Sequence, residues 1–223
     1  MNKTKLSLVC INQFPAVGNF RGLGELNPEQ LASLFETRHE VTDAELDLAV
    51  RAWAAYCSPN PQALEDLLAG DTSALPFLRG ALLHHLARFP STSNGLGRIE
   101  NKALELINAG YGEFTSLFNE FGHAEPVYGL GDCQFWNDLK RIGEARQPLL
   151  LIDGLEMARR DEAQDFTKSV FQLTEAGQTV RSAQDDFLKM NAVDFWLGGV
   201  HLSTQGQVWR WHEQRQQLVY TAS

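Results

Sequence analysis

The sequence predicts an α+β protein that is mainly helical with a small amount of β structure. Apolar residues recur at helical spacing through most of residues 29–142, while short alternating or continuous apolar runs gather near the C-terminus. The chain has 223 residues, 43% of them hydrophobic, with 13 Phe and 5 Trp, so it can bury a sizeable core. We expect a helical N-terminal part, a three-helix module with a β-ribbon, and a C-terminal antiparallel β-meander.

The N-terminal part begins with an apolar run over residues 6–11 that predicts a strand. Pro28 marks the first position of a helix ending at Phe35. Thr42 and Glu45 are spaced as a capping box, which predicts a helix to about residue 56. The apolar stripe expected on that helix consists of Leu46, Ala49, Val50 and Trp53.

Two further helices are predicted before residue 90, over residues 61–68 and 74–89. Residues 90–95, Pro-Ser-Thr-Ser-Asn-Gly, are rich in turn formers and lack large apolar side chains, which favours a domain boundary. The predicted division is therefore 1–90 and 91–223, and these two parts could also pack as one unit.

Residues 96–177 form the central prediction, a module of three helices and a two-stranded ribbon. The helical stripes are Ile99, Ala103, Leu106 and Ile107, then Phe114, Leu117, Phe118 and Phe121, then Phe135, Leu139 and Ile142. The apolar runs 149–152 and 170–173 read as paired strands. No short helix can hide its stripe alone, so we expect one shared core.

Three helices followed by a ribbon resemble a winged helix-turn-helix, in which the third helix enters the major groove of DNA. On that helix we expect Gln134, Asn137, Lys140 and Arg141 to face outward. Gln and Asn side chains read adenine, and Lys and Arg bind phosphate or guanine. Nucleic acid is therefore one candidate partner.

The charge of the chain opposes that interpretation. The net charge is −9, and from residue 111 onward 10 Lys and Arg face 16 Asp and Glu. Nucleic-acid binders present a basic face. An acidic balance favours a protein-interaction scaffold, another candidate function that the sequence leaves open.

After the ribbon we expect a helix over residues 175–190 and then three strands, over residues 200–203, 207–211 and 218–221. Gly198 and Gly199 precede His201, and glycines let a backbone approach a ligand closely. An alternative site, for an enzyme or a small-ligand binder, is a pocket formed by Asp132, Gly199, His201, Trp209 and Trp211. The simpler interpretation is a tight turn with a surface histidine.

No catalytic motif stands out, so the sequence leaves open whether the protein is an enzyme and favours a non-enzyme. It lacks CxxC, HExxH, GxSxG and a P-loop, and we expect no metal and no cofactor. Cys10, Cys57 and Cys133 are widely spaced, which indicates reduced thiols in a cytoplasmic protein, most of them filling the core. No segment reaches the ~20 apolar residues that span a bilayer.

Four strings together resemble a bacterial family known only as domain of unknown function 1835. They are residues 22–31, 69–77, 89–96 and 198–202, and the resemblance covers nearly the whole chain as the C-terminal portion of that family. The resemblance implies a bacterial, cytosolic protein and no named activity or catalytic residue. It also implies a further domain ahead of the strand at residue 6. From the sequence we expect a binding or regulatory protein with a winged-helix-like module.

Overall fold

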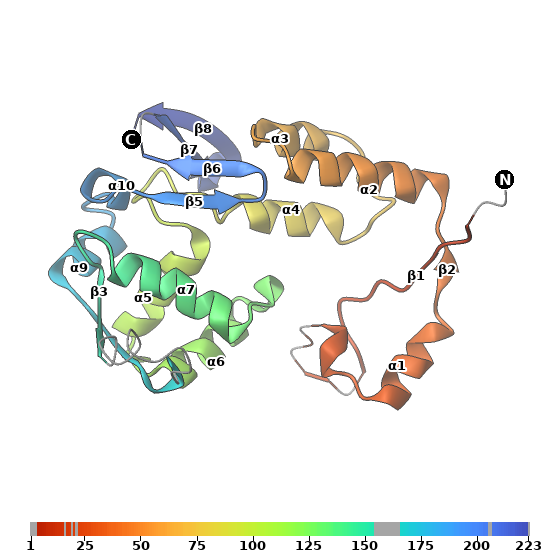
Figure 1. Cartoon of the computed structure of the whole chain (residues 1–223), viewed down its shortest axis with the longest axis horizontal. Coiled ribbons are helices and arrows are strands. Elements are labelled where there is room, and N and C mark those ends of the chain that lie inside the picture. The colour runs from red at the N-terminus through yellow and green to blue at the C-terminus, as the bar shows by residue number, and fades with distance from the viewer. Residues whose placement is uncertain are drawn as a thin grey trace. The chain divides into compact units, whose positions relative to one another are not determined.

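The computed structural model describes residues 4–15, 17, 18, 20, 22–153, 166–204 and 207–222. It has an α+β fold, as the sequence predicts. The chain forms two compact units, residues 1–82 and 83–223 (Figure 1). The predicted boundary at residues 90–95 therefore lies inside the second unit.

The first unit is a small β-bridge followed by helices. Its elements are β1 (Ser7–Leu8), the short 3₁₀ helix η1 (Leu23–Glu25), α1 (Pro28–Phe35), β2 (His39–Glu40), α2 (Asp43–Tyr56) and α3 (Gln62–Ala69), and α4 (Leu78–Leu86) crosses into the second unit. β1 and β2 pair antiparallel over two residues, so the strand predicted over residues 6–11 is shorter than expected.

The start of α2 confirms the predicted capping box. The Thr42 side chain accepts a hydrogen bond from the Glu45 backbone N–H, and the Glu45 carboxylate accepts from the Thr42 N–H at 2.8 Å. The predicted stripe is wrong, because Leu46, Val50 and Trp53 are 45%, 61% and 68% exposed. The helix carries a second apolar face, and its buried residues are Leu48, Ala52 and Ala55. Helix α3 packs against α2 and also buries leucines.

The second unit contains the predicted three helices around one core. They are α5 (Arg98–Asn108), α6 (Phe114–Ala124) and α7 (Asp132–Gly143). Phe114 of α6 and Phe135 of α7 are both fully buried, with ring centroids 6.2 Å apart. Buried positions on all three helices (Ile99, Ala103, Leu104, Phe114, Leu117, Phe121, Phe135, Leu139 and Ile142) confirm the shared core.

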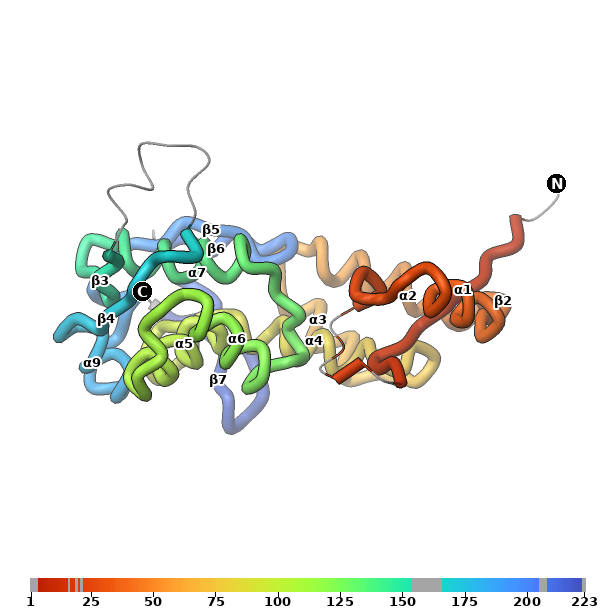
Figure 2. Tube along the Cα trace, turned by 90° about the horizontal axis from the view of Figure 1, so that it is seen from below, coloured from red at the N-terminus to blue at the C-terminus, as the bar shows by residue number. Residues whose placement is uncertain are grey.

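The predicted ribbon is present as β3 (Leu150–Asp153) and β4 (Val170–Leu173), paired antiparallel. A third extended segment joins it between α5 and α6. The Phe171 N–H donates to the Gly112 carbonyl at 2.8 Å, and Glu113 forms an antiparallel bridge with Val170. The order is therefore a helix, a one-residue β-bridge, two helices and two strands. The strand β4 packs beside α5, and β3 packs beside α7 (Figure 2).

Residues 90–95 are a buried connection in the second unit, not a linker between domains. The Asn94 side chain is 3% exposed and donates to the Val180 carbonyl at 3.0 Å. Ser91 bridges to Trp211 in parallel, and the Trp211 N–H donates to the Pro90 carbonyl at 2.8 Å. The backbone bends sharply in this segment, which explains its turn-forming residues. Residues near Val180 and Trp211 pack against the segment.

The C-terminal segments differ from prediction in two ways. The helix expected over residues 175–190 is two helices, α9 (Glu175–Arg181) and α10 (Phe187–Met190), separated where Ala183 adopts a φ of 55°. The expected three-stranded meander is two hairpins. β5 (Asp194–Leu197) pairs with β6 (Val200–Ser203), and β7 (Gln207–His212) pairs with β8 (Gln217–Ala222).

Gly177 in α9 lies against the start of the ribbon. A Cβ at this position would lie 2.2 Å from the Leu149 carbonyl oxygen. We expect Gly177→Ala to lower the free energy of unfolding by about 1–3 kcal/mol, because overpacking outweighs the helical preference of alanine. Urea unfolding measures the change. Gly80→Ala, where the added Cβ has open space, is the control and should not destabilise; equal losses in both variants would contradict the close approach.

The exposure of the cysteines and the length of the helices test two further predictions. All three cysteines are exposed, so the expectation that most of them fill the core is wrong. No helix among the described residues is both long and apolar enough to cross a membrane.

Candidate functional site

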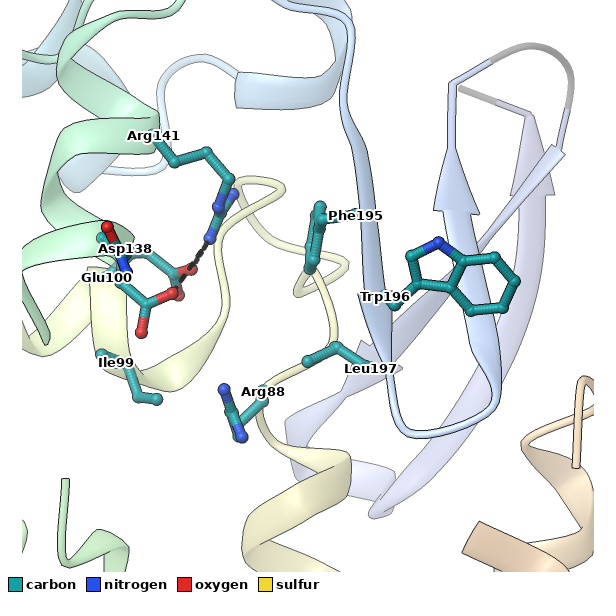
Figure 3. Close-up of a pocket in the computed structure, with 9 residues that line it drawn as sticks. Arg88, Ile99, Glu100, Asp138, Arg141, Phe195, Trp196 and Leu197 are labelled. Carbon is teal, nitrogen blue, oxygen red and sulfur yellow. Dashed lines mark hydrogen bonds and ion pairs between the residues drawn. The ribbon is translucent and has the colours of Figure 1, made fainter. Parts of the chain in front are cut away.

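A cleft of about 230 Å³ lies between α5, α7 and the β5–β6 hairpin (Figure 3). We call it the α7–β5 cleft. Its lining is Arg88, Ile99, Glu100, Asn137, Asp138, Arg141, Phe195, Trp196 and Leu197. Two acids and two arginines thus meet an apolar wall, and a concave site of this composition is the usual form of a ligand-binding pocket.

Arg141 occupies the centre of this charge cluster. Its guanidinium forms an ion pair with Glu100 and lies 3.8 Å from the Asp138 carboxylate. The same guanidinium stacks over the Phe195 ring at 4.3 Å from the ring centroid, so it lies between the acids and β5 (Figure 3). Glu100 is buried, so Arg141 supplies the compensation that a buried carboxylate requires.

Asp138 is the acid of this cluster whose pKa is raised far above its ordinary value. Burial and, to a smaller extent, the nearby Glu100 carboxylate raise the pKa of Asp138 to about 6, although Arg141 and Arg88 oppose the rise. A carboxyl group with such a pKa exchanges its proton close to neutral pH. Perturbed acids that face a cleft are candidates for functional groups.

Arg88 lies on the opposite side of the cleft from Arg141, near Ile99 and Leu197 (Figure 3). Within the part of the chain that the structure describes, its guanidinium has no hydrogen-bond or ion-pair partner. Arg141 neutralises Glu100, so Arg88 provides a cation that a ligand can meet. None of the described lining residues is a Ser, Thr or Cys, so these residues bring charged and amide groups to the cleft but no aliphatic hydroxyl or thiol.

Comparisons with known protein families, with curated proteins and with solved structures find no match. The resemblance to domain of unknown function 1835 stays a prediction from the sequence. Among the described residues, no cluster of three or more His, Cys, Asp or Glu side chains is arranged to hold a metal ion.

The four residues expected to contact DNA have other roles in the structure. Arg141 is engaged as described, and Asn137 lines the cleft. Lys140 lies 4.0 Å from Glu144. The Gln134 side chain accepts a hydrogen bond from the Gly131 N–H at 3.1 Å, which caps α7. The face that would read DNA is thus partly turned toward β5, and its two cations are beside acids.

The alternative pocket residues do not share one cavity. Asp132 is exposed in the first turn of α7, where it follows the cap residue Gly131. Trp209 lies opposite Tyr220 on the β7–β8 hairpin, with ring centroids 4.7 Å apart. Trp211 is buried and lines a different cavity.

His201 and Gly199 lie on the hairpin that borders the cleft. Gly198 and Gly199 form the two-residue turn between β5 and β6. His201 is exposed, and its Nε2 lies 2.6 Å from Asp194 Oδ1. Its ring stacks on Trp196, a lining residue of the cleft, at 4.7 Å between centroids. Of the five residues of the predicted alternative pocket, only His201 and Gly199 therefore lie near the α7–β5 cleft. They do not line it, and His201 reaches it through Trp196.

Sequence reasoning missed Arg88, Glu100 and Phe195 as site residues. A signal existed for Glu100, because it begins the spacing Glu100, Ala103, Leu104 and Ile107 on the buried side of α5. A charged residue on an apolar helical face needs a buried partner. Phe195 gave no such signal, since β5 was not predicted as a strand.

The raised pKa of Asp138 predicts how stability depends on pH. Because the folded protein holds this proton more tightly than the unfolded chain, Asp138 contributes most stability below the unfolded value of 3.8 and loses it as pH rises through about 6. We expect the free energy of unfolding of Asp138→Asn to rise relative to that of the wild-type protein between pH 4 and pH 6.5. Urea titrations across this range measure it, with the exposed Asp153→Asn as control. A difference that does not change with pH would contradict the assignment.

Proposed function

We propose that the second unit is a small-ligand-binding module and that the α7–β5 cleft is its site. The observation that carries the proposal is the pairing of two groups in one concavity. Arg88 has no acceptor among the described residues, and the Asp138 carboxyl has its pKa raised to about 6. Arg88 is half-buried, so its guanidinium needs an acceptor from water or from a ligand.

The lining favours a small organic anion as the ligand. Arg88 would bind the anionic group, and Asp138 and Asn137 would bind polar substituents, because a carboxyl and an amide both offer hydrogen-bonding atoms. Ile99, Phe195 and Leu197 give the apolar wall for the body of the molecule. At about 230 Å³ the cleft is smaller than the ~300–1,000 Å³ of pockets for drug-sized ligands, which favours a compact metabolite.

The test is a titration of the full-length protein, labelled with ¹⁵N, with a panel of small mono- and dicarboxylic acids. The proposal predicts saturable NMR shifts of the Asn137 side chain and of the Phe195 amide for a subset of compounds. Arg88→Gln should weaken that binding at least about tenfold, because a charge-assisted hydrogen bond is lost. The exposed Arg215→Gln is the control and should bind normally.

Two results would contradict the proposal. One is a panel in which no compound shifts these resonances. The other is binding that Arg88→Gln leaves unchanged. Circular dichroism and the thermal midpoint of Arg88→Gln show whether a loss of binding comes from unfolding.

A second candidate function is nucleic-acid recognition by a winged-helix-like module. The order of three helices and a two-stranded ribbon, with a one-residue β-bridge at Glu113 between the first two helices, favours it. The exposure of Gln134 and Asn137 on the third helix favours it too. The engaged cations Lys140 and Arg141 and the acidic composition weigh against it. Titration with duplex DNA at low salt separates the two functions. Binding weakened by Lys140→Glu and Gln134→Ala would favour nucleic acid over the cleft ligand.

A further inference from the structure

A second cavity of about 200 Å³ lies beside α5, where the loop 91–97, the end of α9 and β7 meet. Its lining includes Ser91, Ser93, Asn94, Arg98, Arg181 and Trp211. Its volume is several times the ≈30 Å³ that one water molecule occupies in the liquid. It is separate from the α7–β5 cleft, with which it shares no lining residue.

Most polar groups around this cavity are already paired with each other. Asn94 donates to Asn101 Oδ1 at 2.7 Å and to the Val180 carbonyl at 3.0 Å. Asn101 in turn donates to the Leu96 carbonyl at 3.0 Å, and the Ser91 hydroxyl donates to Asn94 Oδ1 at 2.8 Å. These bonds hold the loop in place and leave few donors for a ligand.

The acids at the rim also have their own cations. Glu105 lies 2.5 Å from Lys102, and Glu213 lies 3.6 Å from Arg98. Arg98 is held more closely by Glu125, at 2.6 Å. These pairs leave the cavity with one lining cation that has no acidic partner within the described ranges.

That cation is Arg181, in the last turn of α9. Its Nε is buried and has no hydrogen-bond acceptor among the described residues. Its Nη2 donates to Gln178 Oε1 at the long distance of 3.5 Å. Leaving a buried donor unsatisfied costs about 1–3 kcal/mol, so such a group commonly has a partner that is not part of the protein.

The next residues hold Arg181 at this position. Ala183, which also lines the cavity, has a φ of 55°, in the left-handed region that alanine rarely adopts. The Ala183 and Gln184 N–H groups donate to carbonyls of Val180 and Thr179 and so close the end of α9 tightly. Unfavourable backbone conformations of this kind persist where the surroundings require them.

We propose that this cavity is an oxyanion-binding site, with Arg181 as the recognition residue. Arg181 has a buried Nε that lacks an acceptor among the described residues, and a guanidinium fork matches the paired oxygens of a phosphate or a carboxylate. A phosphate group carries more charge and more acceptor oxygens than a carboxylate, so it is the stronger of the two ligands. The site does not depend on the function proposed for the α7–β5 cleft.

The side-chain N–H of Arg181 can be followed directly. In ¹H–¹⁵N spectra of the full-length protein, the Nε–H resonance that disappears in Arg181→Lys identifies the residue. We expect inorganic phosphate, added at constant ionic strength, to shift this resonance saturably, and acetate to shift it with weaker affinity. Arg181→Gln should weaken phosphate binding at least about tenfold in calorimetry, because charge-assisted hydrogen bonds are lost. Arg146→Gln, a change at an exposed arginine, is the control and should leave the affinity unchanged.

Stability gives an independent readout that guards against a variant that fails to fold. Without phosphate, Arg181→Gln should be at least as stable as the wild-type protein, since a buried unsatisfied donor is removed. With phosphate, the wild-type protein alone should gain stability, because a ligand stabilises the state that binds it. No saturable shift with either anion, or equal affinities in the wild-type and Arg181→Gln proteins, would overturn the proposal. Equal shifts with acetate and phosphate would support an oxyanion site that also accepts carboxylates.

Discussion

Replacing Phe135 with alanine is expected to lower the free energy of unfolding by about 3–5 kcal/mol, the usual cost of emptying a phenylalanine site in a core. Phe135 is 0% exposed, and its ring centroid lies 4.7 Å from that of Phe121 and 6.2 Å from that of Phe114. It therefore joins α6 and α7 at the centre of the helical core. Small domains have only ~5–15 kcal/mol of stability, so the loss is a large part of the total.

Urea unfolding followed by circular dichroism measures this loss. Val127→Ala is the control, because Val127 is 58% exposed and its truncation should change stability by less than about 0.5 kcal/mol. If Phe135→Ala proved as mild as Val127→Ala, the three helices would not share the core described here.

Removing the Asp186 carboxylate is the second change with a large expected effect. Arg210 is buried, forms an ion pair with Asp186, and donates from Nε to the Ser91 carbonyl at 3.0 Å. Asp186 also accepts from the Leu188 N–H at 2.9 Å, which caps α10. We expect Asp186→Ala to cost about 3–5 kcal/mol, because the guanidinium remains buried without its counter-charge.

A double-mutant cycle with Arg210→Met tests the cause of that cost. If the unpaired charge dominates, Asp186→Ala combined with Arg210→Met should lose less stability than the sum of the two single changes. Changes at independent sites add within about 0.3–0.5 kcal/mol. Additivity within that limit would show that the loss comes from the α10 cap and not from the buried guanidinium.

Local signals in the sequence predicted much of the fold. The capping box at Thr42 and the stripes around Phe114 and Phe135 each depend on nearby residues, and the structure confirms them. The wrong predictions depend on tertiary context. Helix α2 has two apolar faces, and periodicity alone did not identify the face that α3 would cover. Residues 90–95 have the composition of a linker. In the structure they are tied to the second unit, because Arg210 donates to the Ser91 carbonyl and Asn94 donates to the Val180 carbonyl.

The candidate site was less predictable than the fold. Asn137 and Arg141 were expected on an exposed helical face. Asn137 is exposed, but Arg141 is half-buried, because β5 places Phe195 over its guanidinium. Glu100 and Asp138 lie 38 residues apart in sequence, on α5 and α7, and only packing brings both into one cleft. Helical spacing shows which face of α7 a residue lies on but not which distant segment covers that face.

The α7–β5 cleft exists only if the β5–β6 hairpin contacts α7 in solution. Nuclear Overhauser effects between the Phe195 ring protons and the Arg141 side chain measure this contact directly. The 4.3 Å separation of the guanidinium carbon and the ring centroid predicts strong cross-peaks in the ligand-free protein. Phe195 ring protons that show contacts only within their own hairpin, together with a freely exchanging Arg141 guanidinium, would contradict the α7–β5 cleft.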